Sequence, residues 1–327
     1  MLTIIIGGSY VMSGTISIGQ LISFISYIAM LIWPMFAIGR LFNILERGSA
    51  SYNRVEELLS ESSSIIENPN AIQELVNGRL DYRIDEFHYP EDDRVALNHV
   101  HFTIKQGDTL GIVGKTGAGK TTLFKLLLRE YDEYAGSIRF GGHDIRDYSL
   151  NALLHGIGYV PQDQFLFSTT IRENIRFANP NLTEEDVINA AKLTAIHDDI
   201  LGLPNGYDTL VGERGVSLSG GQKQRISIAR ALITNPELLI LDDALSAVDA
   251  KTEEAILSAL KAQRRDQTTI IAAHRISSVM HAEEIIVLDD AEIIERGNHQ
   301  ELIEIDGWYQ DMFDRQQLED KLEGGAN

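Results

Sequence analysis

The chain has 327 residues, no cysteine and a formal net charge of −20. Without cysteine it forms neither a disulfide framework nor a thiolate metal site. Its acidic charge, with no basic stripe to offset it, argues against a nucleic-acid partner. Residues 1–39 hold no charged side chain, so all the acidity belongs to the later part of the chain. A chain of this length predicts two structural units.

The uncharged N-terminal region contains one segment that is long enough to cross a bilayer. Residues 2–12 are too short for this, but an apolar stretch from Ile18 or Leu21 to Leu41 can span about 30 Å of hydrocarbon. Two alternatives to a membrane-spanning helix are a signal peptide and a buried core helix. The segment lacks the basic start and the cleavage site of a signal peptide. The arginines that follow place the next part of the chain in the cytosol: Arg40, Arg47 and Arg54.

Changes in composition predict four parts. Residues 1–47 are expected to be a partial membrane domain, with the end of one helix and a last spanning helix, and residues 48–77 a cytosolic helix extension and linker. A soluble domain covers 78–315, and the polar tail 316–327 is expected to be disordered. One spanning helix cannot enclose a pathway, so we expect that the N-terminus is truncated.

Strands and helices alternate in the soluble part. Residues 174–201 are mostly helical in pattern, with Thr183 as an N-cap, and residues 285–295 read as a hairpin. Alternation of this kind indicates an α/β fold with a mainly parallel sheet, whose ligand lies beyond the carboxyl ends of the strands. Apolar runs predict buried strands at residues 109–113, 238–241 and 268–273.

The phosphate-loop pattern G-x-x-x-x-G-K-[ST] lies between a predicted strand and a predicted helix. Glycines there let backbone N–H groups approach phosphate oxygens at a helix N-terminus. Lys120 would reach the β- and γ-phosphates, and the Thr121 hydroxyl would bind Mg²⁺. A glycine-rich turn without a ligand is the alternative. The nucleotide-binding residues that the pattern predicts are Gly114, Lys115, Thr116, Gly117, Ala118, Gly119, Lys120, Thr121 and Thr122.

Three further motifs follow the phosphate loop: LSGGQ at residues 218–222, LLILDD at 238–243, and His274 after the next strand. Together they resemble the nucleotide-binding domain of ATP-binding-cassette (ABC) transporters over roughly residues 78–315. Residues 17–40 are similar to the last transmembrane helix of the exporter type, in which a membrane domain precedes the cassette. The resemblance implies a P-loop NTPase cassette with a mainly parallel sheet, an antiparallel β subdomain and a helical subdomain.

The resemblance also implies roles for residues around MgATP. Tyr89 would stack on adenine, and Asp242 would hold Mg²⁺ together with Thr121 and Gln162. The catalytic residues would be Asp243, His274 and Gln162. Without the resemblance, Tyr89 reads as a surface tyrosine at a strand end and His274 as a structural histidine.

The LSGGQ motif implies a partner chain. In this family its glycines, which precede a helix, form a cradle for the γ-phosphate of an ATP that is held by the opposite subunit. The chain should therefore act as a dimer, with Asp249 at the same interface. The residues of this cradle are Ser219, Gly220, Gly221 and Gln222.

Asp243 departs from the family pattern, which usually has a glutamate as the base or water-positioning group. Aspartate is one methylene shorter, which withdraws the carboxylate by about 1.5 Å, and a displacement near 1 Å can cost on the order of 10²-fold in rate. We expect slow hydrolysis at this chain's own phosphate loop with ATP binding retained, unless a shifted water lets aspartate act nearly as well. An intact LSGGQ beside this substitution resembles heterodimeric multidrug-type exporters with one degenerate site.

The sequence thus predicts an ATP-binding and ATP-hydrolysing subunit of an ABC exporter in the plasma membrane, multi-pass when full-length and with its cassette in the cytoplasm. Cassette dimerisation driven by MgATP would be coupled, through the helical subdomain and residues 209–215, to export of a substrate that the sequence does not identify. Its partners would be a second half-transporter and the lipid bilayer, with no nucleic acid. A homodimeric exporter and a non-transport cassette ATPase are the alternatives.

Overall fold

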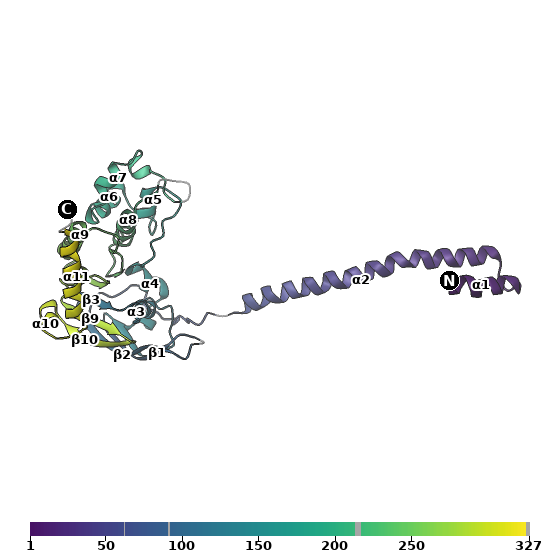
Figure 1. The fold of residues 1–327 in the computed structure, drawn as a ribbon, viewed down its shortest axis with the longest axis horizontal. Coiled ribbons are helices and arrows are strands. Elements are labelled where there is room, and N and C mark those ends of the chain that lie inside the picture. Colours follow the sequence, from purple (N-terminus) through teal and green to yellow (C-terminus); the bar gives the residue numbers. More distant parts are fainter. Residues whose placement is uncertain (62, 91, 213–216, 325–327) are drawn as a thin grey trace. The chain divides into compact units, whose positions relative to one another are not determined.

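A computed structural model describes residues 1–61, 63–90, 92–212 and 217–324. The chain divides into two units, Met1–Ser63 and Ser64–Asn327. Figure 1 labels many of their helices and strands, and each unit is described by itself.

The first unit consists of helices α1 (Leu2–Met12) and α2 (Ile18–Ser60). A capping box starts α2, because the Ser17 side chain accepts from the backbone N–H of Gln20 and the Gln20 side chain accepts from that of Ser17. With 43 residues at about 1.5 Å each, α2 is roughly 65 Å long. Among the described helices it alone is long and apolar enough to cross a membrane. It covers both the predicted spanning segment and the predicted helical extension.

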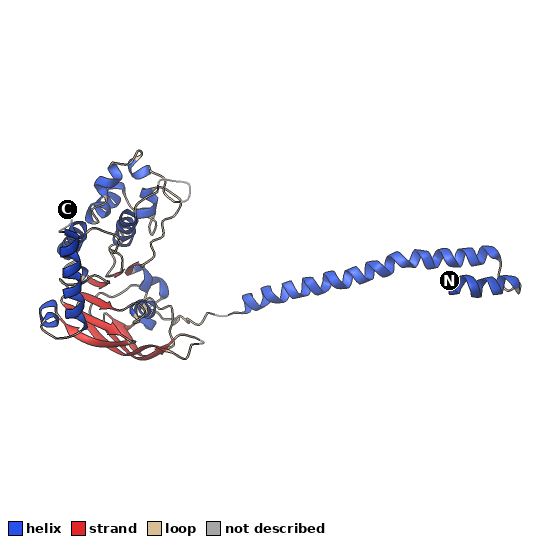
Figure 2. Ribbon diagram, viewed as in Figure 1, coloured by secondary structure: helices blue, strands red, loops and turns tan. Residues whose placement is uncertain are grey.

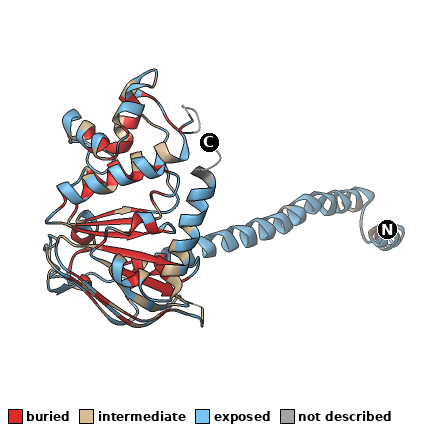
Figure 3. Ribbon diagram, turned by 60° about the vertical axis from the view of Figure 1, so that its left-hand side comes forward, coloured by how far each residue is buried: buried red, intermediate tan, exposed pale blue. Residues whose placement is uncertain are grey.

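The second unit contains a mainly parallel sheet of six strands in the order β10-β9-β3-β8-β7-β6. All neighbouring pairs are parallel except β9 and β10, which form the predicted hairpin. The strands β3, β7 and β8 are almost wholly buried, as their unbroken apolar runs predict (Figure 3). The strands are β3 (Thr109–Gly114), β6 (Ile157–Val160), β7 (Leu238–Asp242), β8 (Thr268–Ala272), β9 (Glu284–Asp289) and β10 (Glu292–Gly297).

A second, antiparallel sheet has the order β2-β1-β4-β5. Its inner side chains share one core with β3 and with helix α3 (Lys120–Leu127), which follows the phosphate loop. Tyr82 of β1, Ile112 of β3 and Phe124 of α3 are all buried in that core. The strands are β1 (Leu80–His88), β2 (Val95–Ile104), β4 (Ala135–Phe140) and β5 (His143–Asp144).

Helices α5 to α8 form a lobe with its own apolar core, which includes Ile171, Val187 and Ile226 (Figure 2). Residues 174–201, predicted as mostly helical, are divided among three of these helices. Thr183 caps α6 as predicted, and the break before it contains Pro180, which cannot continue a helix. The helices are α5 (Ile171–Ile175), α6 (Glu184–Leu193), α7 (His197–Leu201) and α8 (Gly220–Leu232).

The prediction of a disordered tail at 316–327 was wrong for residues 316–324. Helix α11 (Trp308–Gly324) continues through them, and residues 325–327 lie outside the described part. Tyr309 near its start is fully buried, and Met312 and Phe313 pack on the same core, so the packed turns support the polar continuation. The other helices are α4 (Leu150–His155), α9 (Ala250–Gln263), α10 (His299–Ile303) and the 3₁₀ turns η1 (Ile145–Asp147), η2 (Gly206–Asp208) and η3 (Ile276–Ser278).

The predicted linker 48–77 ends sooner than expected, because the cassette unit begins at Ser64. Arg129 holds part of it in place. Its guanidinium is 1% exposed and donates to Asp132, to the Tyr148 carbonyl and to the Ile66 carbonyl, the last at 3.3 Å. The carboxylate of Glu67 also accepts from the backbone N–H of Leu150 at 2.8 Å. Residues shortly before β1 therefore belong to the folded cassette.

Candidate functional site

The phosphate loop follows β3 and starts α3, as the motif predicts. Gly114 has φ +148°, and a Cβ there would lie 2.0 Å from the Leu288 carbonyl oxygen. Gly119 has φ +105°, and a Cβ there would lie 3.0 Å from the Ala96 carbonyl oxygen. Both positions need glycine because the backbone is left-handed and approaches neighbouring strands closely.

Lys120 is buried under this loop. Its Nζ donates to the carbonyl oxygens of Gly114 at 2.7 Å and Lys115 at 2.9 Å. Burial lowers its pKa, while the carboxylates of Asp242 and Asp243 oppose that shift. An ammonium has three N–H donors, so within the described chain one donor remains for an anion at the loop.

The Asp242 carboxylate is paired with Thr121. The Thr121 hydroxyl donates to Asp242 Oδ2 at 3.0 Å, and the Tyr159 hydroxyl donates to the same oxygen at 3.4 Å. Asp242 is only 3% exposed, and this burial raises its pKa, although both hydrogen bonds act in the opposite direction. A hydroxyl and a carboxylate are hard oxygen donors of the kind that Mg²⁺ prefers, so these residues fit that ion. Tyr159 was not predicted, because nothing in the sequence marks it apart from a strand-forming tyrosine.

Gln162, Asp243 and His274 lie beyond the carboxyl ends of three neighbouring parallel strands. Gln162 follows β6, Asp243 follows β7, and His274 follows β8. Asp243 has φ +50°, and its backbone N–H donates to the Ala272 carbonyl at 2.8 Å, which holds the end of β7 against β8. The side chains of Gln162 and His274 are exposed. The structure therefore gathers these residues at the sheet edge that carries the phosphate loop.

Tyr89 lies beside the phosphate-loop helix. Its hydroxyl is hydrogen-bonded to the Thr122 hydroxyl at 2.9 Å. The ring packs edge-on against Phe87 and Tyr131, and Lys125 Nζ lies 5.4 Å from its centroid. These contacts fix an aromatic ring next to the helix that follows the phosphate loop.

The LSGGQ residues lie at the start of α8, in the helical lobe. Ser219 is the N-cap and forms a capping box with Gln222. A Cβ at Gly221 would lie 2.7 Å from the Ala247 carbonyl oxygen, so the helix passes close to the loop after β7. Helix α8 contacts α5, α6, β6 and β7, whereas α3 contacts β2 and β3. The motif is thus built on different elements from the phosphate loop of the same chain (Figure 1).

Gln224 joins α8 to the loop after β7, which sequence reasoning did not find. Its Nε2 donates to Ser246 Oγ at 3.0 Å, and its Oε1 accepts from the Ala247 N–H at 2.8 Å. Ser246 Oγ in turn donates to the Asp243 carbonyl at 3.0 Å. A buried glutamine in an otherwise ordinary helix carries no sequence signal for contacts 22 and 23 residues away.

Asp249 and residues 209–215 had predicted roles outside the phosphate loop. Asp249 is the N-cap of α9 and accepts from the Thr252 N–H at 3.0 Å. Hydrogen bonding with the side chain of Thr252 and then with its backbone lowers the pKa of Asp249. The carbonyl of Thr209 accepts from the Ile171 N–H at 3.1 Å, which ties this segment to the helical lobe. The rest of the predicted coupling segment, residues 213–215, lies outside the described residues.

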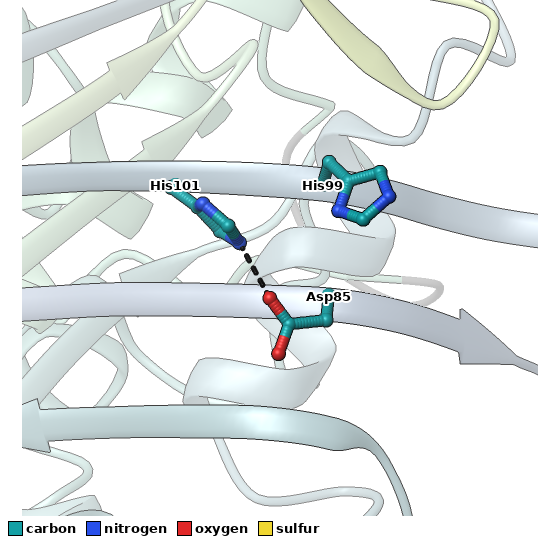
Figure 4. Close-up of side chains that lie close together, drawn as sticks. All are labelled: Asp85, His99 and His101. Carbon is teal, nitrogen blue, oxygen red and sulfur yellow. Dashed lines mark hydrogen bonds and ion pairs between the residues drawn. The ribbon is translucent and has the colours of Figure 1, made fainter.

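A separate polar cluster lies on the antiparallel sheet, where ligand atoms of Asp85, His99 and His101 come within 4.8 Å of one another (Figure 4). Asp85 Oδ1 is hydrogen-bonded to His101 Nε2 at 2.9 Å and also lies 3.6 Å from Arg83 Nε. A cation would have to displace this guanidinium. We therefore describe the cluster as a surface ion-pair network.

Residues 97–246 match the family model for ABC transporter. Over 320 residues the chain is 48% identical to the "Probable multidrug resistance ABC transporter ATP-binding/permease protein YheI" of Bacillus subtilis (strain 168), covering 98% of this chain and 55% of that protein. It is 48% identical over 318 residues to the "Multidrug resistance-like ATP-binding protein MdlA" of Escherichia coli (strain K12), covering 97% and 54%. A solved bacterial Atm1-family ABC exporter with ATP bound aligns with a TM-score of 0.80 and 38% identity, covering 92% of this chain and 53% of that one.

The chain spans about half the length of the curated relatives it matches. Over that half, the matches confirm the predicted P-loop cassette fold with an apolar helix before it. The family match lies within the second unit, at residues 97–246, and both curated relatives carry "ATP-binding" in their names.

Proposed function

Because residues 97–246 match the family model for ABC transporter, we propose that this chain is the ATP-hydrolysing subunit of a multidrug-type exporter in the plasma membrane. The observation that carries the proposal is the combination of an apolar α2 with a cassette in which Lys120, Thr121 and Asp242 meet at one sheet edge. The cassette would lie in the cytoplasm, and the full-length protein would cross the membrane several times.

In this proposal Lys120 exchanges its two loop carbonyls for the β- and γ-phosphate oxygens of ATP. Mg²⁺, when bound, neutralises phosphate charge, and Thr121 and Asp242 are the residues that would hold it, joined by Gln162. Asp243 and His274 would orient the attacking water, with His274 next to the γ-phosphate. The place of these residues at the carboxyl edge of the sheet supports these roles.

The chain would act in a dimer with a second half-transporter. The placement of LSGGQ on α8, on elements other than those of its own phosphate loop, supports a cradle that serves the ATP of the partner. Asp249 would lie at the same interface. ATP binding would close the two cassettes, and hydrolysis would release them and move the attached helices.

We further propose that the partner is a different chain and that the site on this chain's phosphate loop hydrolyses slowly. Asp243 supports this, because its carboxylate is one methylene shorter than the family's glutamate. A homodimeric exporter is the alternative, and partner-dependent activity separates the two. The same measurement, made on Asp243→Glu, addresses the slow site directly.

Asp243→Glu is expected to raise ATP hydrolysis at this chain's phosphate loop about 10-fold or more, since a 1 Å misplacement can cost on the order of 10²-fold. The measurement is steady-state phosphate release by the full-length exporter, alone and with its candidate partner. Asp306→Glu, a change at an exposed position, is the matched control. Robust turnover by the chain alone that Asp243→Glu leaves unchanged would contradict both the slow site and the heterodimer.

Tyr89→Ala is expected to weaken ATP binding about 10-fold, because base stacking on an aromatic ring contributes roughly 1–3 kcal/mol. Tyr89→Phe keeps the ring and loses only the hydrogen bond to Thr122, so it should bind ATP almost as well as the parent. Equilibrium binding of a fluorescent ATP analogue reads out both variants. If both lost affinity equally, the hydroxyl and not the ring would be the important group.

The membrane location is tested by extraction. The full-length protein should stay in the membrane fraction through an alkaline carbonate wash and should be released by detergent. Release by the carbonate wash would favour the non-transport cassette ATPase, whose nucleotide site would be unaffected.

A further inference from the structure

We infer that Gln316 of α11 is a positioning residue that holds the backbone around His274 and thereby sets the place from which the His274 imidazole reaches the nucleotide. This inference rests on the role of His274 in the proposed function. It assigns a catalytic purpose to the helix that continues through the polar C-terminal segment.

The Gln316 side chain bonds to the backbone on both sides of Arg275. Its Nε2 donates to the His274 carbonyl at 2.8 Å, and its Oε1 accepts from the Ile276 N–H at 2.8 Å. A backbone carbonyl can only accept and a backbone N–H can only donate, so these partners fix which end of the amide is which. A single planar amide therefore bridges two peptide groups that are 40 and 42 residues away.

The bridge holds a short segment that is also anchored by two contacts to backbone carbonyls and by an ion pair of Arg275 with Glu253 at 3.5 Å. The Ala273 N–H donates to the Ile112 carbonyl of β3 at 3.0 Å, and the Arg275 guanidinium donates to the Val248 carbonyl at 3.0 Å. The His274 side chain is exposed, and among the described residues its imidazole makes no hydrogen bond. The position and direction of the Cα–Cβ bond from which the imidazole extends are thus set by the backbone that Gln316 holds.

Helix α11 is a firm support for this bridge. Tyr309 is buried and its hydroxyl is hydrogen-bonded to His299 Nδ1 at 2.9 Å. Phe313, one turn before Gln316, packs on the core below β8 and β9. Gln316 therefore extends from a helix that is fixed to the cassette, which is the arrangement that precise positioning requires.

The experiment compares Gln316→Ala, Gln316→Glu and the control Gln317→Ala in the full-length exporter. Gln317 is the exposed neighbour on the same helix. Gln316→Ala should lower kcat for ATP hydrolysis about 10-fold and change ATP affinity less than 2-fold, because a loosened histidine affects the reacting geometry and not the phosphate loop. Gln317→Ala should leave both unchanged.

Gln316→Glu has nearly the same shape and tests the direction of the bridge. The carboxylate can still accept from the Ile276 N–H but cannot donate to the His274 carbonyl, so kcat should fall at least as far as in Gln316→Ala. If Gln316→Ala does not fold, kcat of Gln316→Glu tests the positioning role of Gln316. Parent-like kcat in Gln316→Glu, or an equal loss in Gln317→Ala, would overturn the inference.

The double variant His274→Ala with Gln316→Ala separates the inference from the function on which it rests. If Gln316 acts through His274, its removal adds no further loss when the imidazole is absent. An additive loss would show that Gln316 acts by another route and would overturn the inference. If His274→Ala alone kept full hydrolysis, the proposed role of His274 would fail, and the inference with it, whatever the Gln316 variants do.

Discussion

Lys120→Ala is expected to weaken MgATP binding about 100-fold, because it removes charge-assisted hydrogen bonds to phosphate that are worth about 1.5–3 kcal/mol each. The fold should survive. Burial lowers the pKa of Lys120, which means that the folded protein holds the charged form less well than the unfolded chain does. Removing the charge therefore removes an electrostatic cost of folding.

The measurement for Lys120→Ala is equilibrium binding of MgATP together with the midpoint of urea unfolding. Lys105→Ala, at an exposed position before β3, is the matched control and should bind ATP like the parent. If Lys120→Ala kept parent affinity with an intact fold, the phosphate loop would not be the nucleotide site.

Asp242→Asn is expected to slow Mg²⁺-dependent ATP hydrolysis about 100-fold, because it removes the negative charge that would hold the ion while keeping an oxygen for the Thr121 hydroxyl. Hydrolysis measured over a range of Mg²⁺ concentrations should show a weaker apparent affinity for the ion. Asp306→Asn changes the same charge at an exposed position and serves as the control. Parent-like hydrolysis at low Mg²⁺ in Asp242→Asn would contradict the metal role.

The same substitution should increase stability above the pH at which the carboxyl ionises. Burial raises the folded-state pKa of Asp242 above the ordinary value of an aspartate. The folded state binds this proton more tightly than the unfolded chain does. Ionisation of Asp242 therefore costs stability as the pH rises from the unfolded-state pKa to the folded-state pKa, and the cost persists at neutral pH. In the absence of Mg²⁺, Asp242→Asn should unfold at a higher urea concentration than the parent at pH 7. The difference should shrink as the pH falls through the raised folded-state pKa of Asp242, and it should vanish below the ordinary pKa of an aspartate.

Local patterns in the sequence predicted most of the fold and the phosphate loop. The apolar runs of β3, β7 and β8 are buried strands, and the glycines at 114 and 119 occupy positions where a side chain would clash. Such features depend on residues near one another in the chain, so their periodicity and spacing can be read directly.

Contacts between distant segments could not be read in this way. Gln224 and Gln316 are ordinary polar residues in helices, and each gains its role from a backbone group more than 20 residues away. The polarity of residues 316–324 suggested disorder, because the pattern alone does not show that Tyr309 and Phe313 anchor the preceding turns in the core. The early start of the cassette also depends on a distant residue, Arg129, which holds the Ile66 carbonyl.

The bridge made by Gln224 has a consequence for how two nucleotides would influence one another. Gln224 of α8 donates to Ser246 Oγ, and Ser246 Oγ donates to the Asp243 carbonyl. Helix α8 and the backbone of Asp243 are therefore directly coupled by hydrogen bonds. In the proposed dimer, LSGGQ would contact the partner's ATP, and this hydrogen-bonded path would connect that contact to the backbone of Asp243 in this chain's own site. ATP hydrolysis at the two proposed sites would then occur in a fixed order and not independently.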